Sequence, residues 1–127
     1  NFLTETYLSL RRLETKVLKA MKDLNFSEAY KQGSLIKIQN FHGMEINDYA
    51  QLVAKTALWI ADYQMFKETW NVCRGASDFL PLKTNDSIKH CNALKEDWGV
   101  YQDVDYIIGN PPFVGSSKQT KEQKIVL

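Results

Sequence analysis

The sequence predicts an α/β fold in which helices cover a sheet of parallel strands. Residues 4–24 and 48–65 carry apolar side chains at the three- and four-residue spacing of amphipathic helices. Three short segments, at 41–46, 87–91 and 105–109, have the composition and the flanking residues of strands in such a sheet. We therefore expect helices that flank a small sheet within one domain.

The composition is that of a globular domain. A chain of 127 residues is long enough for about one domain with a modest core. Its 44% hydrophobic and 24% charged residues exclude the disordered and collagen-like classes. The formal net charge of +1 lacks the basic excess expected of a chain that holds nucleic acid by itself, because Lys and Arg supply most of that affinity.

The cysteines and the hydropathy pattern predict where the protein resides. Cys73 and Cys91 have neither metal-ligand spacing nor the pattern of a disulfide framework, so we expect reduced thiols, no metal and a cytoplasmic protein. No apolar run approaches the roughly 20 residues that cross a bilayer, and we expect no membrane contact. Because the sequence starts at Asn1 without a methionine, we also expect it to begin inside a larger protein.

The first helix is predicted for residues 4–24. Thr4 has the side chain of an N-cap, and Asn25 or Gly33 is expected to mark the end of the ordered segment. We expect this helix to serve packing alone. Its predicted apolar face consists of Tyr7, Leu10, Leu13, Val17 and Met21.

Residues 41–46 predict a short buried strand that meets a helix cap at Asn47 and Asp48. Glu45 lies at the carboxyl end of this strand. Ligands bind at that edge of parallel sheets, and a carboxylate there can accept hydrogen bonds from both hydroxyls of a ribose. The alternative is a Glu45 that simply faces water.

The second helix, predicted for residues 48–65, is wide and apolar, as a helix that covers a sheet should be. Trp59 and Tyr63 fit this helical spacing, and we expect them in the core rather than in an aromatic binding surface. Residues 67–84 have no clear period and predict an ordered loop.

Residues 87–91 predict a second strand, and Asn92 follows it. Glu45, Asn92 and Asn110 would then lie at three strand ends. Because the carboxyl ends of parallel strands face the same way, these side chains are expected to converge on one crevice.

Three further features are interpreted as structural. His42 and His90 are better explained as strand or loop residues than as catalysts. Trp98 lies in a polar turn and is expected to be buried in the core. Residues 118–124 resemble the start of a polar helix, whose lysines are expected to face solvent rather than a phosphate backbone.

The predicted strand 105–109 leads into Asn110-Pro111-Pro112-Phe113. Each proline fixes φ at about −65° and has no N–H, so this backbone is pre-ordered and its carbonyls lack neighbouring donors. Asn110 adds a side-chain acceptor and Phe113 adds an aromatic face. A planar amine or amide could donate to these acceptors and stack on the ring, although a simple strand-terminating turn is an equal alternative.

Taken in order, five segments resemble the S-adenosylmethionine-dependent DNA methyltransferases that modify the N6 of adenine. More narrowly, they resemble the bacterial type II restriction-modification proteins of the MmeI-like group, which fuse methyltransferase and endonuclease activities. These segments are Asn1-Phe2-Leu3, Phe41-His42-Gly43-Met44-Glu45-Ile46-Asn47, Thr56-Ala57-Leu58-Trp59, Asn92-Ala93-Leu94 and Tyr106-Ile107-Ile108-Gly109-Asn110-Pro111-Pro112-Phe113-Val114-Gly115.

The resemblance implies a partial Rossmann-like class I methyltransferase sheet with flanking helices, truncated within a single catalytic domain at residues 1–127. In this family a glycine-rich loop binds the methionine part of the cofactor, and the chain begins at the Asn of that loop, which makes Asn1 a cofactor residue. Glu45 corresponds to the acidic residue that binds the ribose. Asn92 stands where the family often has Asp near the adenine of the cofactor.

The resemblance also implies a mechanism for the segment that starts at Asn110. The target adenine leaves the duplex at a cost of a few kcal/mol, and stacking on Phe113 recovers about 1–3 kcal/mol. Its N6 amine donates to the Asn110 side-chain oxygen and to the Pro111 carbonyl, within the Asn110–Phe113 motif that also includes Pro112. These bonds aim the nitrogen lone pair at the methyl group.

Two alternatives stay open at this stage. The same loop could hold a protein glutamine or an RNA adenine, or the chain could be a non-catalytic scaffold segment of a larger assembly. Without the glycine-rich loop, we expect the isolated chain to bind cofactor very weakly and to be inactive. A truncated sheet also exposes a strand edge, so we expect copies of the chain to self-associate.

Overall fold

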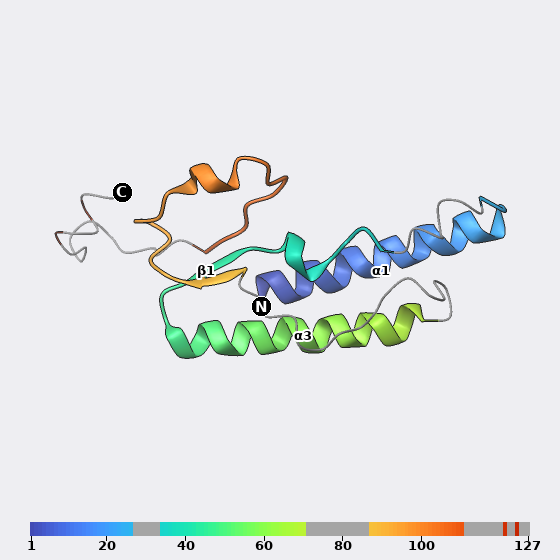
Figure 1. Ribbon diagram of the computed structural model, residues 1–127, viewed down its shortest axis with the longest axis horizontal. Helices are drawn as coiled ribbons and strands as arrows, with labels where there is room; N and C mark the ends of the chain where they lie inside the picture. The colour runs from blue at the N-terminus through green and yellow to red at the C-terminus, as the bar shows by residue number, and fades with distance from the viewer. Residues whose placement is uncertain (27–33, 71–86, 111–120, 122–123, 125–127) are drawn as a thin grey trace.

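Residues 1–26, 34–70, 87–110, 121 and 124 are described by the computed structural model of the protein. Within these residues the chain forms two long helices and a two-stranded parallel sheet (Figure 1). The elements are α1 (Phe2–Asp23), the 3-10 turn η1 (Ile38–Asn40), β1 (Gly43–Glu45), α3 (Asp48–Thr69), β2 (Ile88–His90) and the 3-10 turn η2 (Trp98–Tyr101).

The two strands and the helix between them form a β-α-β unit. β1 pairs with β2 in parallel, with Gly43 opposite Ile88 and Glu45 opposite His90. Two parallel neighbours cannot be joined by a tight turn, and α3 lies in the connection between them. The predicted α/β class and the parallel pairing are therefore confirmed, whereas a larger Rossmann-like sheet stays a prediction.

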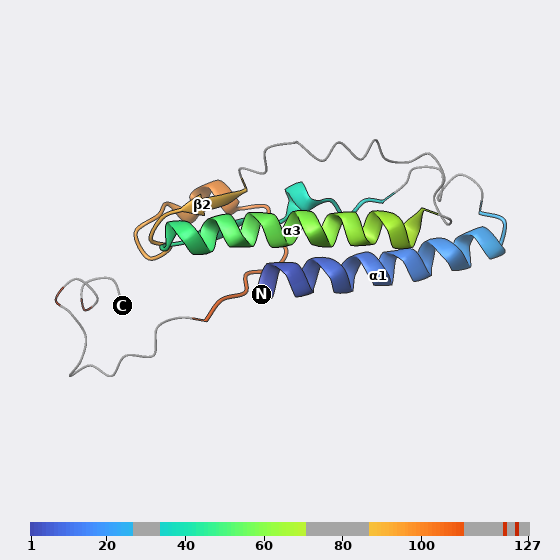
Figure 2. The same ribbon diagram turned by 90° about the horizontal axis from the view of Figure 1, so that it is seen from below.

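The elements pack in layers around the sheet. α1 and α3 lie side by side and run in the same direction in both views (Figures 1 and 2). Ile88 of β2 joins the core with these helices. Lys89, the next residue, points to the opposite face, where its ammonium lies 5.7 Å from the ring centroid of Tyr101 in η2. The short sheet thus has helices on one face and η2 on the other.

The core lies between α1, α3 and the sheet. Tyr7, Leu58 and Met65 are its largest fully buried side chains. Tyr7 meets Phe41 edge-on, with ring centroids 5.3 Å apart. The other buried members of this cluster are Leu8, Ile38, Ala61 and Ile88.

α1 buries a different face from the one that its apolar pattern predicts. Leu13 and Val17 are 58% and 50% exposed, while Arg11 and Thr15 are buried. These polar residues tolerate burial because Arg11 pairs with Glu14 at 2.8 Å and the Thr15 hydroxyl donates to the Arg11 carbonyl at 2.8 Å. The predicted Tyr7 is buried as expected.

One end of α1 differs from the prediction and the other agrees with it. The helix begins at Phe2, so Thr4 lies inside its first turn and is not the N-cap. At the other end, Asn25 follows Leu24, the C-cap, with a φ of 61°. This left-handed conformation is a common helix terminator and one that Asn tolerates well, which confirms the predicted end at Asn25.

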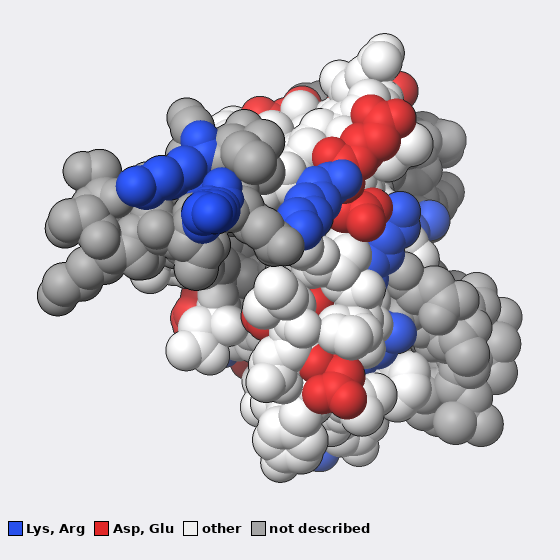
Figure 3. Space-filling view, turned by 90° about the vertical axis from the view of Figure 1, so that its left-hand side faces the viewer, with Lys and Arg blue, Asp and Glu red and all other residues white. Residues whose placement is uncertain are grey.

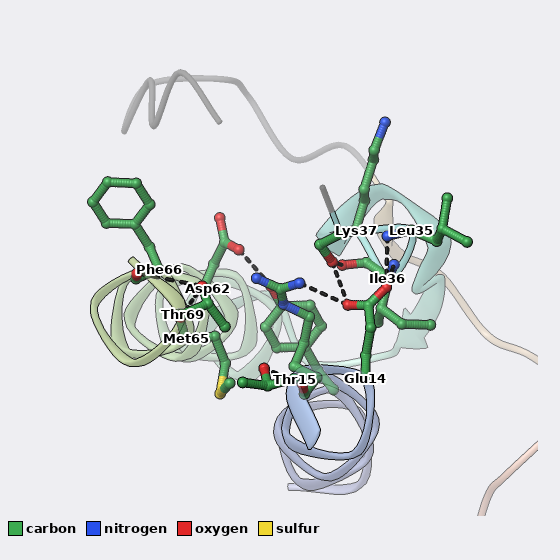
Figure 4. Close-up of polar contacts among 12 residues, drawn as sticks. Glu14, Thr15, Leu35, Ile36, Lys37, Asp62, Met65, Phe66 and Thr69 are labelled. Atoms are coloured by element: carbon green, nitrogen blue, oxygen red, sulfur yellow. Dashed lines mark hydrogen bonds and ion pairs between the residues drawn. The ribbon is translucent and has the colours of Figure 1, made fainter. Parts of the chain in front are cut away.

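Glu14 connects α1 to the segment that leads toward β1 (Figure 4). Its carboxylate accepts hydrogen bonds from the backbone N–H groups of Leu35 and Ile36, at 2.6 and 3.1 Å, and from the Ser34 hydroxyl. It also pairs with the buried guanidinium of Arg11. Since such charge-assisted bonds are stronger than neutral ones, Glu14 fixes the path of residues 34–36 over the helix.

Tyr7 links the two long helices through a polar contact. Its hydroxyl donates to the Asp62 carboxylate of α3. Burial, reinforced by this hydrogen bond, raises the pKa of the Tyr7 hydroxyl well above its ordinary value of 10.0. The folded state therefore holds this proton more tightly than the unfolded state does.

We expect the free energy of unfolding to fall as the pH rises above about 10, because a raised pKa stabilises the fold only while the unfolded tyrosine keeps its proton. In Tyr7→Phe this part of the alkaline dependence should disappear. Urea unfolding of both chains between about pH 8 and 11 measures the difference in slope. Tyr106→Phe, at a side chain that is 83% exposed, should keep the original slope; equal slopes in all three chains would contradict the assignment.

α3 is longer and less buried than predicted. It extends to Thr69, so residues 67–69 are helical and do not belong to the predicted loop. The prediction that Trp59 and Tyr63 are core residues is wrong, because they are 39% and 45% exposed. Only the face with Leu58, Ala61 and Met65 meets α1 and the sheet, since a helix can turn only part of its surface toward one small core.

The predicted third strand does not form in the described residues. Residues 106–110 adopt no regular secondary structure, and Tyr106, Ile107 and Ile108 are 83%, 68% and 56% exposed. An apolar segment becomes a strand only where a neighbour supplies the other half of the hydrogen-bond ladder, and the β1-β2 sheet does not reach it. The predicted core residue Trp98 is likewise 45% exposed.

Some predictions fall on residues outside the described ones. These are Gly33 as a helix end, the predicted loop beyond Trp70, and the polar helix at 118–124 apart from Lys121 and Lys124, which are helical and exposed as expected. Among the described residues, no helix is both long and apolar enough to span a membrane.

Candidate functional site

The structure brings Glu45 and Asn92 to the same edge of the sheet. Glu45 is the last residue of β1, and Asn92 follows β2 by two residues. The backbone N–H of Cys91 donates to the Glu45 carbonyl at 2.9 Å, which extends the pairing of the two strands past the last ladder position. The two strand ends therefore lie at one edge of the sheet, as parallel pairing requires, and a crevice between their side chains stays a prediction.

Glu45 has a defined local environment. Its side chain is half-buried, and Oε1 accepts a hydrogen bond from the Asn47 N–H at 3.0 Å. Asn47 in turn caps α3, because its side-chain oxygen accepts from the Ala50 N–H at 2.9 Å. The predicted cap at Asn47 is thus confirmed, and the corner between β1 and α3 is held by consecutive side-chain-to-backbone bonds.

Asn92 begins a compact turn after β2. Its side-chain oxygen accepts from the Leu94 N–H at 3.0 Å, and its carbonyl accepts from the Lys95 N–H at 2.9 Å. The indole N–H of Trp98 donates to the Ala93 carbonyl at 2.8 Å and so closes the turn from its far side. The Asn92 amide N–H₂ group has no hydrogen-bond partner among the described residues.

Sequence reasoning missed two side chains that tie the site together. Gln51 of α3 donates from Nε2 to the Ile88 carbonyl at 2.6 Å, which locks the helix to β2. The ring nitrogen Nε2 of His90 lies 2.9 Å from the Ile46 carbonyl, just past β1. Neither contact has a sequence signal, because each joins residues that are 37 or 44 positions apart.

The remaining predicted site residues lie elsewhere. Asn1 is exposed at the end of α1 nearest the sheet, and its side chain makes no capping hydrogen bond (Figure 1). Asn110 ends the exposed segment that follows η2, and this segment runs away from the two strands (Figure 2). Of the three predicted points, Glu45 and Asn92 lie at the edge of the β1-β2 sheet, whereas Asn110 follows a segment that is not part of this sheet. Pro111, Pro112 and Phe113 are outside the described residues.

The start of α1 packs closely against β1. A Cβ atom placed on Gly43 would lie 2.8 Å from the Cδ1 atom of Leu3 and 3.4 Å from a side-chain carbon of Ile88. The absence of a side chain at Gly43 therefore allows Leu3, two residues after Asn1, to lie directly on the strand. This contact sets the position of the α1 N-terminus relative to the sheet.

The electrostatics of this region are mixed. Acidic and basic side chains lie next to one another on the side of the molecule shown in Figure 3, interspersed with uncharged surface. Desolvation and the nearby Glu96 carboxylate raise the pKa of the Cys91 thiol above its ordinary value. Within the described ranges no group of three or more His, Cys, Asp or Glu side chains could hold a metal ion.

The β-α-β unit, with polar side chains at its strand ends, defines an α/β fragment. The chain belongs to the family described as "MmeI, DNA-methyltransferase domain", whose model matches residues 1–127. It is 38% identical over 130 residues to a Bacillus subtilis (strain 168) protein named "DNA methyltransferase A". That alignment covers 98% of this chain and 15% of the relative, and no solved structure matched the chain.

Proposed function

We propose that this chain is part of a catalytic domain that transfers a methyl group from S-adenosylmethionine to the N6 of an adenine flipped out of duplex DNA. The observation that carries the proposal is the match of the whole chain to a DNA-methyltransferase domain family. The paired strand ends that hold Glu45 and Asn92 agree with it, because nucleosides bind at this edge of α/β sheets.

The described residues support a cofactor-binding role for the corner between β1 and β2. One carboxylate oxygen of Glu45 is occupied by the Asn47 N–H, which leaves acceptor capacity on the other oxygen for ribose hydroxyls. The amide donors of Asn92, which have no partner among the described residues, suit the acceptor nitrogens of an adenine ring. Asn1 is proposed to contact the methionine part of the cofactor, since Leu3 holds that end of α1 against β1.

The chemistry is assigned to Asn110, Pro111, Pro112 and Phe113. In this proposal the Asn110 side-chain oxygen and the Pro111 carbonyl accept the two N6 protons of adenine, and Phe113 stacks on the base. S-adenosylmethionine supplies the electrophilic methyl group when it is bound. The protein acts mainly by orientation, because a displacement of about 1 Å of the reacting atoms can cost on the order of 100-fold in rate.

The proposal is tested by methyl transfer with the full-length protein. Duplex DNA is incubated with S-adenosylmethionine labelled in its methyl group, and the DNA is then digested to nucleosides. Label in N6-methyladenine supports the proposal, and label in another base would overturn the N6 assignment. RNA and protein glutamine peptides are assayed in parallel, because they are the alternative substrates of such a loop; absence of any transfer would favour a scaffold role.

A restriction-modification role would place this activity beside an endonuclease, and we propose that role on the resemblance to the MmeI-like group.

The 127 residues alone are proposed to bind cofactor only weakly and to be inactive. Isothermal titration of the isolated chain with S-adenosylmethionine checks this point. Micromolar binding would contradict it.

We also expect copies of the isolated chain to associate in solution. The two-stranded sheet has open edges among the described residues, and the apolar side chains of Tyr106, Ile107 and Ile108 are exposed nearby in sequence. Light scattering at increasing concentration should give a mass above that of one chain, 14.7 kDa. A constant monomeric mass at high concentration would contradict this expectation.

A further inference from the structure

His90 lies beside Glu45 at the carboxyl edge of the sheet. The two residues are partners in the β1-β2 register, so their side chains leave the same face of neighbouring strands. From this position the imidazole reaches the backbone that follows β1, where its Nε2 lies 2.9 Å from the Ile46 carbonyl oxygen. The contact joins β2 to the residue immediately after Glu45.

The chemistry of this contact determines the role of each atom. A backbone carbonyl can only accept a hydrogen bond, so the Nε2 atom of His90 must carry the proton and donate it. The imidazole therefore acts here as a fixed N–H donor toward Ile46. Both groups are solvent-exposed, which makes the bond a local constraint rather than a main source of stability.

The same corner is restrained from two other directions. The Asn47 N–H donates to Glu45 Oε1 at 3.0 Å, and the Asn47 side chain caps α3. Gln51, one turn into α3, donates to the Ile88 carbonyl of β2 at 2.6 Å. The loop from Glu45 to Gln51 is thereby held at both ends by β2, and His90 restrains the residue that directly follows Glu45.

We infer that His90 is a positioning residue that holds the Ile46 carbonyl and thereby fixes the Glu45 carboxylate at the strand edge. This inference rests on the proposed function for its ligand, which is the ribose diol of a nucleoside cofactor. Without the His90 bond, the peptide between Ile46 and Asn47 loses its restraint from β2, and the Asn47 N–H orients Glu45 Oε1 less strictly. The affinity of the site for the two ribose hydroxyl groups is then expected to fall.

The test compares His90→Ala with His90→Gln and His42→Ala in the full-length protein. Gln places an amide N–H₂ near the position of the histidine Nε2 and should rescue the contact. His42 is the matched control, because its ring contacts Tyr101 of η2, at 5.5 Å between centroids, on the other side of the sheet. Two quantities are measured: exchange of the Asn47 amide hydrogen, and the dissociation constants of S-adenosylhomocysteine and its 2′,3′-dideoxy analogue.

In His90→Ala we expect Asn47 exchange to rise about fivefold and the preference for the ligand with both hydroxyls to fall by a similar factor, the size of one exposed hydrogen bond. His90→Gln and His42→Ala should retain both values. A general structural defect would weaken both ligands equally and leave their ratio unchanged. That unchanged ratio, or an unchanged Asn47 exchange rate, overturns the inference.

The two hypotheses fail in different ways. If the unaltered protein binds neither ligand, the proposed function fails, and His90 is then judged by Asn47 exchange alone. If the unaltered protein prefers the hydroxylated ligand and His90→Ala does so equally, the cofactor site stands and the role of His90 is wrong.

Discussion

Replacing Asn110 by alanine is expected to lower kcat for DNA methyl transfer by at least about 100-fold, while the affinity for S-adenosylmethionine stays within about twofold. The substitution removes the side-chain oxygen proposed to accept an N6 proton, so the amine of the flipped base loses its orientation toward the methyl group. Single-turnover assays with the full-length protein and saturating duplex DNA measure the chemical step separately from binding.

Asp103→Ala is a suitable control for Asn110→Ala. Asp103 is exposed and precedes the same segment, but it has no proposed contact with the base. We expect this control to retain methyl transfer within about twofold. If Asn110→Ala remained as active as the control, the assignment of the Asn110–Phe113 motif to catalysis would be lost, although cofactor binding at Glu45 would be unaffected.

Leu58→Ala is expected to lower the free energy of unfolding by about 2–5 kcal/mol, the usual cost of removing a leucine side chain from a closed core. Leu58 is fully buried and belongs to the cluster that joins α3 to Tyr7 of α1 and Ile88 of β2. The substitution leaves a cavity where two helices and the sheet meet, and the surrounding side chains cannot fill it without moving these elements. Urea unfolding of the 127-residue chain, followed by circular dichroism, measures the change.

The same substitution at Leu52 provides the control. Leu52 is on the same helix but is 59% exposed, so Leu52→Ala removes the same atoms from a largely solvated site. We expect a change within about 0.5 kcal/mol. A similar loss of stability in both variants would mean that α3 packs through a different face from the one described.

Local features of the chain were largely predictable. The helices at α1 and α3, the cap at Asn47 and the helix end at Asn25 follow from side chains only a few residues apart. Helical spacing and caps act within one or two turns, so residues that are close in sequence determine these features. Glu45 and Asn92 could be placed at strand ends for the same reason, because Glu45 lies at the end of one short predicted strand and Asn92 follows the other.

Only the tertiary structure decided which faces are used and which long-range contacts form. The buried face of α1 includes Arg11, since Glu14 satisfies its charge, while Trp59 stays partly exposed because α3 has one packing surface. The segment before Asn110 remains unpaired because strand formation depends on a neighbour and not on its own apolar residues. The contact of His90 with Ile46 likewise depends on strand register, which two distant segments determine together.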